Sequence, residues 1–124
     1  MFSLDDLEQA TGVVRSVMPP TPQYAWPLLR RRYGVELVVK HENHTPIGAF
    51  KVRGGLTYLN RLRHERVQAK GVVSATRGNH GQSLAFAGMQ FGVPVAVVVS
   101  RQLGREERGD EGVRSRDNRA WRGL

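Results

Sequence analysis

Apolar residues recur at helical spacing in the first third of this chain. Between residues 4 and 17 they fall every three or four positions, which predicts one amphipathic helix, and Ser3 is placed to cap its first turn. A second, shorter helix is predicted over residues 25–33, because Pro27 suits a first helical turn and Gly34 suits a helix end. A proline-rich connector separates the two helices.

Three apolar runs farther along have the character of strands. They cover residues 35–42, 71–75 and 95–99, and the last is the continuous apolar run typical of a parallel strand that is covered on both faces. Helical spacing returns between them, over residues 49–66 and 79–91. Strand, helix, strand, helix, strand predicts an α/β fold with a mostly parallel sheet and βαβαβ crossovers. All three strands are expected to share one sheet.

Two glycines interrupt the helix predicted after the first strand. Gly54 and Gly55 each cost a helix about 1 kcal/mol relative to alanine. Such a cost predicts close packing of this helix against another backbone or a bound molecule.

One lysine stands just inside the start of that helix. Lys51 follows the turn Pro-Ile-Gly at residues 46–48 and stands next to Phe50. A lysine held beside helix N–H groups and under an aromatic ring is poorly solvated and easier to deprotonate than a surface lysine. Such an amine suits attack on a carbonyl to form a Schiff base. On these residues alone, Lys51 can equally be one more basic residue on an amphipathic helix.

The second strand ends in another glycine-bearing turn. Residues 74–82 read Ser-Ala-Thr-Arg-Gly-Asn-His-Gly-Gln and lead directly into a predicted helix. Because the carboxyl ends of parallel strands meet at one edge of a sheet, this turn and the turn before Lys51 predict a single pocket.

Together the two turns resemble the fold-type II pyridoxal-phosphate enzymes, which share a tryptophan-synthase-β-like fold, and the serine/threonine dehydratase (threonine ammonia-lyase) group in particular. The likeness rests on Ala-Phe-Lys-Val-Arg-Gly at residues 49–54 and Gly-Asn-His-Gly-Gln at residues 78–82. It makes residues 1–100 the N-terminal part of a dehydratase domain. It implies pyridoxal 5'-phosphate as the cofactor, a small hydroxy amino acid as the substrate, and a homo-oligomer for the full-length relative.

The resemblance also implies roles for individual residues. Lys51 matches the lysine that holds the cofactor as a Schiff base and later removes the substrate α-proton. Phe50 matches the residue packed beside the cofactor, and Asn79 matches the side chain that bonds an oxygen on the pyridine ring, although Asn79 can also be a plain helix cap. The loop that contacts the substrate carboxylate is matched by Thr76, Arg77, Gly78, His80 and Gly81. His80 is expected to shape this loop without an acid/base role, and no metal is implied.

Two positions depart from the family pattern. Ala49 stands where many members have serine, and Arg77 stands where some members have a serine that acts as a second base. Racemisation needs a base on each face of the substrate, so β-elimination of L-threonine or L-serine to a 2-oxo acid and ammonia is the expected activity of the full-length relative.

The glycine-rich phosphate loop and the polar partner of the pyridine nitrogen are absent from these 124 residues. This chain is therefore expected to hold the cofactor weakly and to turn over little or nothing.

The net charge of +8 raises a competing hypothesis, a non-catalytic basic fragment that binds nucleic acid or a protein partner. The charge is scattered and no zinc-finger spacing or aromatic run accompanies it, which makes this the weaker alternative.

The lack of cysteine excludes a disulfide scaffold and a thiolate metal site. No apolar run is long enough for a membrane span and the first residues do not resemble a signal peptide, so a cytoplasmic location is expected.

The pattern changes after Ser100. Residues 101–124 carry seven arginines, no lysine and almost no apolar periodicity, which is typical of a disordered basic tail. A frameshift is a second interpretation. Residues 101–107 can be encoded by cgg caa ctc ggt cga gaa gaa, and a start one base later gives GNSVEK. With permitted codons, the shifted frame can continue as an amphipathic helix and the start of a strand.

We predict that a single-base frameshift near codon 100 produced residues 101–124. The nucleotide sequence checks this directly, and the next frame is expected to encode Gly-Asn-Ser followed by a helix similar to the dehydratase family. If no frame downstream of codon 100 encodes such a segment, the frameshift hypothesis fails.

Overall fold

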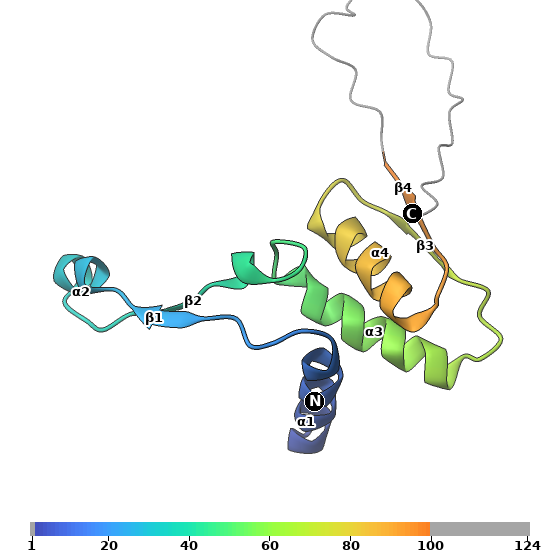
Figure 1. Ribbon diagram of the computed structural model, residues 1–124, viewed down its shortest axis with the longest axis horizontal. Helices are drawn as coiled ribbons and strands as arrows, with labels where there is room; N and C mark the ends of the chain where they lie inside the picture. Colours follow the sequence, from blue (N-terminus) through green and yellow to red (C-terminus); the bar gives the residue numbers. More distant parts are fainter. Residues whose placement is uncertain (1, 100–124) are drawn as a thin grey trace, which may run out of the picture.

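The computed structural model describes residues 2–99, so the tail at residues 101–124 lies outside the described part of the chain. The elements, in chain order, are α1 (Leu4–Val17), β1 (Gln23–Ala25), α2 (Pro27–Tyr33), β2 (Val38–Lys40), the 3-10 helix η1 (Glu42–His44), α3 (Lys51–Glu65), β3 (Val72–Ala75), α4 (Asn79–Phe91) and β4 (Val95–Val98). Figure 1 shows α1, α3, α4, β3 and β4 gathered in one body, from which β1, β2 and α2 extend as an arm.

The predicted first helix is confirmed as α1, and its cap explains where it begins. The Ser3 hydroxyl accepts a hydrogen bond from the Asp6 amide at 3.1 Å, and the Asp6 carboxylate accepts one from the Ser3 amide at 2.7 Å. This reciprocal pair satisfies two amide groups that a helix start leaves without partners. At the other end, Val14 and Met18 are buried in the core cluster, and α1 packs against α3.

The core lies mainly between α3 and α4, which run side by side in the same direction (Figure 1). Its buried side chains from these helices are Val52, Leu56, Leu59, Leu84 and Ala87. Gly55 is buried at the contact, where an added Cβ would lie 2.8 Å from the Ser83 carbonyl oxygen. The predicted close packing of a glycine against another backbone is therefore confirmed at Gly55. At Gly54 a Cβ would meet nothing within 4 Å among the described residues, so no backbone packs there, and contact with a bound molecule stays a prediction.

Strands β3 and β4 form a parallel pair, with Val72 opposite Val95 and Ala75 opposite Val98. Helix α4 connects them and packs on their inner face through Gly88, where a Cβ would lie 2.7 Å from Val95 Cγ2. The parallel β3–α4–β4 crossover predicted from the apolar runs is confirmed.

The prediction that residues 35–42 join the same sheet is wrong. Strand β2 pairs with β1 in a separate antiparallel sheet, with Gln23 opposite Lys40 and Ala25 opposite Val38. An apolar run predicts an extended backbone but not its partner, and β1 is the nearer partner along the chain, which makes the closed loop short. Residues 23–25 are consequently extended, and the predicted helix over residues 25–33 begins only at Pro27.

None of the helices described between residues 2 and 99 is long and apolar enough to cross a membrane. In the same part of the chain, no group of three or more His, Asp or Glu side chains is placed to hold a metal ion.

We predict opposite effects for alanine at the two neighbouring glycines of α3. Gly54→Ala is expected to stabilise the fold by about 0.5–1 kcal/mol, because it improves helix propensity in open space. Gly55→Ala gains the same propensity but overlaps the α4 backbone, and a net loss of about 1–2 kcal/mol is expected. Urea unfolding followed by circular dichroism measures both free energies of unfolding. Equal effects of the two substitutions would contradict the packing described at Gly55.

Candidate functional site

The turn before Lys51 is held by one buried threonine. The Thr45 hydroxyl accepts a hydrogen bond from the Ala49 amide at 2.8 Å and donates one to the Ala49 carbonyl at 2.9 Å. Gly48, inside this turn, has a φ of +67°, a conformation that side chains with a Cβ rarely adopt. The local sequence thus sets the point at which α3 starts and places Lys51 as its first residue.

The side chain of Lys51 is exposed and lies against Phe50. The Lys51 Nζ atom is 5.1 Å from the centre of the Phe50 ring, a distance suited to a cation–π contact. The Phe50 side chain is itself 59% exposed. The predicted contact between the two residues is confirmed, but the predicted poor solvation of Lys51 is wrong, because the residue is exposed.

Two residues beyond Lys51, α3 is anchored by an ion pair that the sequence analysis missed. Arg53 donates from Nε to Glu42 Oε2 at 2.7 Å and from Nη2 to Glu42 Oε1 at 2.9 Å. The Thr21 hydroxyl donates to the same carboxylate at 2.6 Å. We call Thr21, Glu42 and Arg53 the Glu42 cluster. It joins the connector after α1, the 3-10 helix η1 and the first turn of α3.

The Glu42 cluster lowers the pKa of Glu42 from an ordinary value of 4.5 to about 2. Hydrogen bonds from Arg53 are the largest cause, and the Thr21 hydroxyl adds to them, while partial burial of the carboxyl opposes the shift. The Arg53 pKa is raised by the same hydrogen bonds to Glu42. Both groups are therefore held in their charged forms. In the sequence, this cluster is signalled by the Thr-Pro pair at residues 21–22 and by Arg53, two residues after Lys51. Neither signal indicates that Arg53 and Glu42 are in contact.

The second predicted turn leads into α4 without a side-chain cap. Gly78 occupies the cap position, Asn79 is the first helical residue, and no side chain bonds the first amides. The alternative role of Asn79 as a plain helix cap is therefore wrong. Exposed helix N–H groups favour an anion at this end. Asn79, His80 and Arg77 are all exposed around it.

Buried contacts shape the loop from within. A Cβ on Gly81 would lie 2.8 Å from Thr76 Cγ2 and 3.0 Å from Val97 Cγ1, so α4 starts in contact with both strands. The Thr76 hydroxyl also accepts a bond from the Gly78 amide at 3.4 Å. Thr76, Gly78 and Gly81 thus give the loop its form, while the exposed residues of the loop are free to contact a ligand.

One hydrogen bond joins the two turns. The hydroxyl of Ser83, in the second turn of α4, donates to the Lys51 carbonyl at 2.5 Å. The starts of α3 and α4 consequently lie together at one end of the helix pair (Figure 1). The structure thus brings the backbone of Lys51 next to the helix that carries Asn79. The close approach of the two side chains themselves stays a prediction. Ser83 was also missed by the sequence analysis, since a serine within a helix gives no local signal of its partner.

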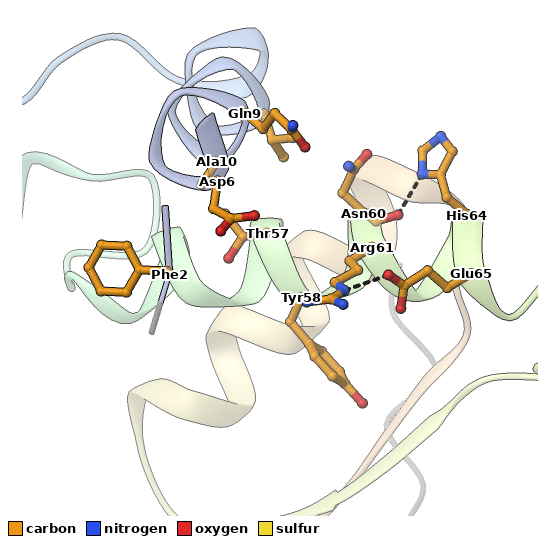
Figure 2. A pocket seen from close by; sticks show the side chains of 11 residues that line it. Phe2, Asp6, Gln9, Ala10, Thr57, Tyr58, Asn60, Arg61, His64 and Glu65 are labelled. Carbon is orange, nitrogen blue, oxygen red and sulfur yellow. Dashed lines mark hydrogen bonds and ion pairs between the residues drawn. The ribbon is translucent and has the colours of Figure 1, made fainter. Parts of the chain in front are cut away.

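A groove elsewhere in the molecule contains none of the predicted site residues. It measures about 880 Å³ and lies between α1 and the later turns of α3 (Figure 2). Its polar side chains mostly bond within their own helices, as in the 2.7 Å pair between Arg61 and Glu65 and the 2.7 Å contact of His64 Nδ1 with the Asn60 carbonyl. The candidate site is therefore the shared end of α3 and α4, not this groove.

Comparison with known proteins gives one family. Residues 14–109 match the model of the pyridoxal-phosphate dependent enzymes. The L-threonine ammonia-lyase of Thermotoga maritima is 34% identical over 101 residues, which cover 82% of this chain and 25% of that protein. The serine racemase of Bos taurus is 34% identical over 100 residues, which cover 79% of this chain and 30% of that protein.

Solved structures give the same answer. A pyridoxal 5'-phosphate-dependent aspartate racemase matches with a TM-score of 0.73 and 32% identity, over 78% of this chain and 31% of that one. The processed form of threonine deaminase isoform 2 from Solanum lycopersicum matches with a TM-score of 0.62 and 29% identity, over 79% of this chain and 28% of that one. This chain spans about a quarter to a third of the length of these relatives.

We predict that the Glu42 cluster makes stability depend on acid pH. Because the folded pKa of Glu42 is about 2 and its ordinary value is 4.5, the unfolded chain binds more protons between these values. The contribution is complete above about pH 4.5 and is lost as the pH falls towards 2. About 1–2 kcal/mol is expected, after allowance for the partial exposure of both side chains.

The test compares urea unfolding of the wild type and Glu42→Gln across this pH range. The variant is expected to be less stable near neutral pH and to lose less stability on acidification. Glu65→Gln is the control, because it removes an exposed ion pair that contributes less than about 1 kcal/mol. Identical pH profiles of the wild type and Glu42→Gln would rule out the predicted linkage.

Proposed function

Because this chain belongs to the pyridoxal-phosphate dependent enzymes, we propose that residues 1–100 are the lysine-bearing N-terminal part of a serine/threonine dehydratase. The complete enzyme would remove water from L-threonine or L-serine by β-elimination, and a water molecule would then hydrolyse the resulting enamine to a 2-oxo acid and ammonia. The observation that carries the proposal is the hydrogen bond between Ser83 and the Lys51 carbonyl, since it puts the start of the lysine helix beside the loop that opens α4.

The residues at this end suit pyridoxal 5'-phosphate. Lys51 offers an exposed primary amine, and the half-exposed ring of Phe50 offers a flat apolar surface next to it. The start of α4 offers amide groups that no side chain caps. Space is open over Gly78, where an added Cβ would meet nothing within 4 Å. The amine and the aromatic surface suit an aldehyde on a flat ring, and the anion-binding helix start suits the carboxylate of an amino acid substrate.

Each residue then has a defined task. Lys51 Nζ would hold the cofactor through its aldehyde, and as a free amine it would accept the α-proton of the substrate. The Asn79 amide would bond an oxygen of the cofactor, and the Phe50 ring would pack against the cofactor. The amides at the start of α4 bind the substrate carboxylate. When bound, the cofactor supplies an electron sink for the charge that develops at the α-carbon.

Elimination is favoured over racemisation, although serine racemases are among the relatives. Inversion at the α-carbon needs a second group that exchanges a proton on the opposite face. Arg77 stands where a serine takes that role in some members of the family, and a guanidinium does not lose its proton in proteins. We assign Arg77 and His80 to the substrate-carboxylate loop, together with Thr76, Gly78 and Gly81.

The activity proposed for this chain by itself is weak. Lys51 is exposed, and an amine in water is a poorer nucleophile near neutral pH than one in a dry pocket. The chain also spans only about a quarter of the length of its ammonia-lyase relative. Cofactor capture by Lys51, and not turnover, is therefore the property to test.

We predict that pyridoxal 5'-phosphate reacts preferentially with Lys51. The chain has three lysines, Lys40, Lys51 and Lys70, so borohydride reduction followed by peptide mapping can assign every adduct. Most of the reduced adduct is expected on Lys51 and should disappear in Lys51→Ala. Lys70→Ala is the matched control, because Lys70 is an exposed lysine outside the site, and its removal should leave the Lys51 adduct unchanged.

Equal labelling of the three lysines would contradict the proposed function. The competing hypothesis, a basic fragment that binds nucleic acid, predicts such unselective labelling together with binding to arbitrary DNA that weakens steeply as salt is raised.

A further inference from the structure

We infer that Ser83 is a positioning residue for Lys51. Its hydroxyl holds the Lys51 backbone against α4 and so sets where the lysine side chain begins relative to the loop at residues 78–81. The inference rests on the proposed function of Lys51, but it concerns a residue that no resemblance brought into the site.

The contact between the two helices is short, and on the Ser83 side it is buried. Ser83 is fully buried, with 0% of its surface exposed, and its Oγ atom lies 2.5 Å from the Lys51 carbonyl oxygen. A buried hydroxyl needs a partner, and here the partner belongs to a residue 32 positions earlier in the chain. The bond therefore links the first turn of α3 to the second turn of α4, one turn beyond Asn79.

Gly55 makes room for this hydroxyl. A Cβ at position 55 would overlap Ser83 Oγ and would lie 2.8 Å from the Ser83 carbonyl oxygen. The glycine one turn after Lys51 is thus what lets the serine reach the Lys51 carbonyl. The cost of a glycine inside α3 is offset at this position by close contact and by the hydrogen bond.

Position matters at Lys51 because its side chain is long and exposed. Four rotatable bonds separate Nζ from the backbone, and besides the Phe50 ring the exposed side chain has few contacts that direct it. The position of the backbone therefore sets the volume that Nζ can reach. The Glu42 cluster holds the first turn of α3 from the arm side through Arg53, and Ser83 holds it from the side of the loop.

The test measures where the cofactor is captured when the hydroxyl is removed. Wild type and Ser83→Ala are treated with pyridoxal 5'-phosphate and borohydride, and the ratio of the Lys51 adduct to the Lys70 adduct is determined by peptide mapping. Thermal unfolding of each variant is recorded in parallel. Ser83→Ala is expected to lower the ratio about fivefold, the factor that corresponds to one ordinary hydrogen bond.

Ser16→Ala is the matched control. The Ser16 hydroxyl also donates to a helix carbonyl, that of Val13 at 2.8 Å, but in α1 and on the surface. The same substitution there should leave the ratio unchanged. Should Ser83→Ala fail to fold by circular dichroism, Ser83→Cys replaces it, since a thiol keeps the shape but donates more weakly. Its ratio is then expected below that of the wild type.

The outcomes separate this inference from the proposed function. If the wild type labels Lys51 selectively and the serine variant keeps the wild-type ratio while melting at a lower temperature, Ser83 only stabilises the fold and the inference is overturned. If the wild type shows no preference for Lys51 over Lys70, the proposed function itself fails.

Discussion

The close contact of α3 and α4 at Gly55 brings the start of the helix that carries Lys51 beside the helix that carries Asn79. Only a residue without a Cβ lets the two backbones come within reach of one hydroxyl, and Ser83 uses that reach to bond the Lys51 carbonyl. Leu56, Leu59 and Leu84 are buried in the core cluster that these two helices share. Apolar burial supplies most of the stability of such a pair, while the glycine determines how closely the helices approach.

The features set by local periodicity could be predicted from the sequence. Helix α4 occupies residues 79–91, as its apolar spacing and its glycines indicate, and the two valine-rich runs around it form a parallel pair. The partner of β2 could not be predicted, because an extended apolar run such as Val38–Lys40 is compatible with several neighbours. In the site, the lysine turn and the loop were recognisable by resemblance. The bonds from Ser83 to Lys51 and from Arg53 to Glu42 were not, since each joins residues far apart in the chain.

Two interactions of different physical kinds hold the turn that leads into Lys51. The Glu42 cluster is partly exposed and charged, so its contribution depends on pH and salt. The Ser83 bond is neutral and buried, so acid and salt have little direct effect on it. A fall in pH from about 4.5 towards 2 should therefore weaken the arm side of the turn before the side that faces α4. The exposure of Lys51 and Phe50 between these interactions fits a chain that spans only about a quarter of its ammonia-lyase relative.

In the proposed site, Lys51 and Asn79 serve one cofactor ring. The most direct measurement is a nuclear Overhauser spectrum of the labelled protein after borohydride has fixed the cofactor on Lys51. Contacts between the protons of the pyridine ring and the side-chain amide of Asn79 are predicted, together with shifts of the backbone amides at residues 78–81. A ring fixed on Lys51 that shows contacts to Phe50 but none to Asn79 or its loop would contradict the account.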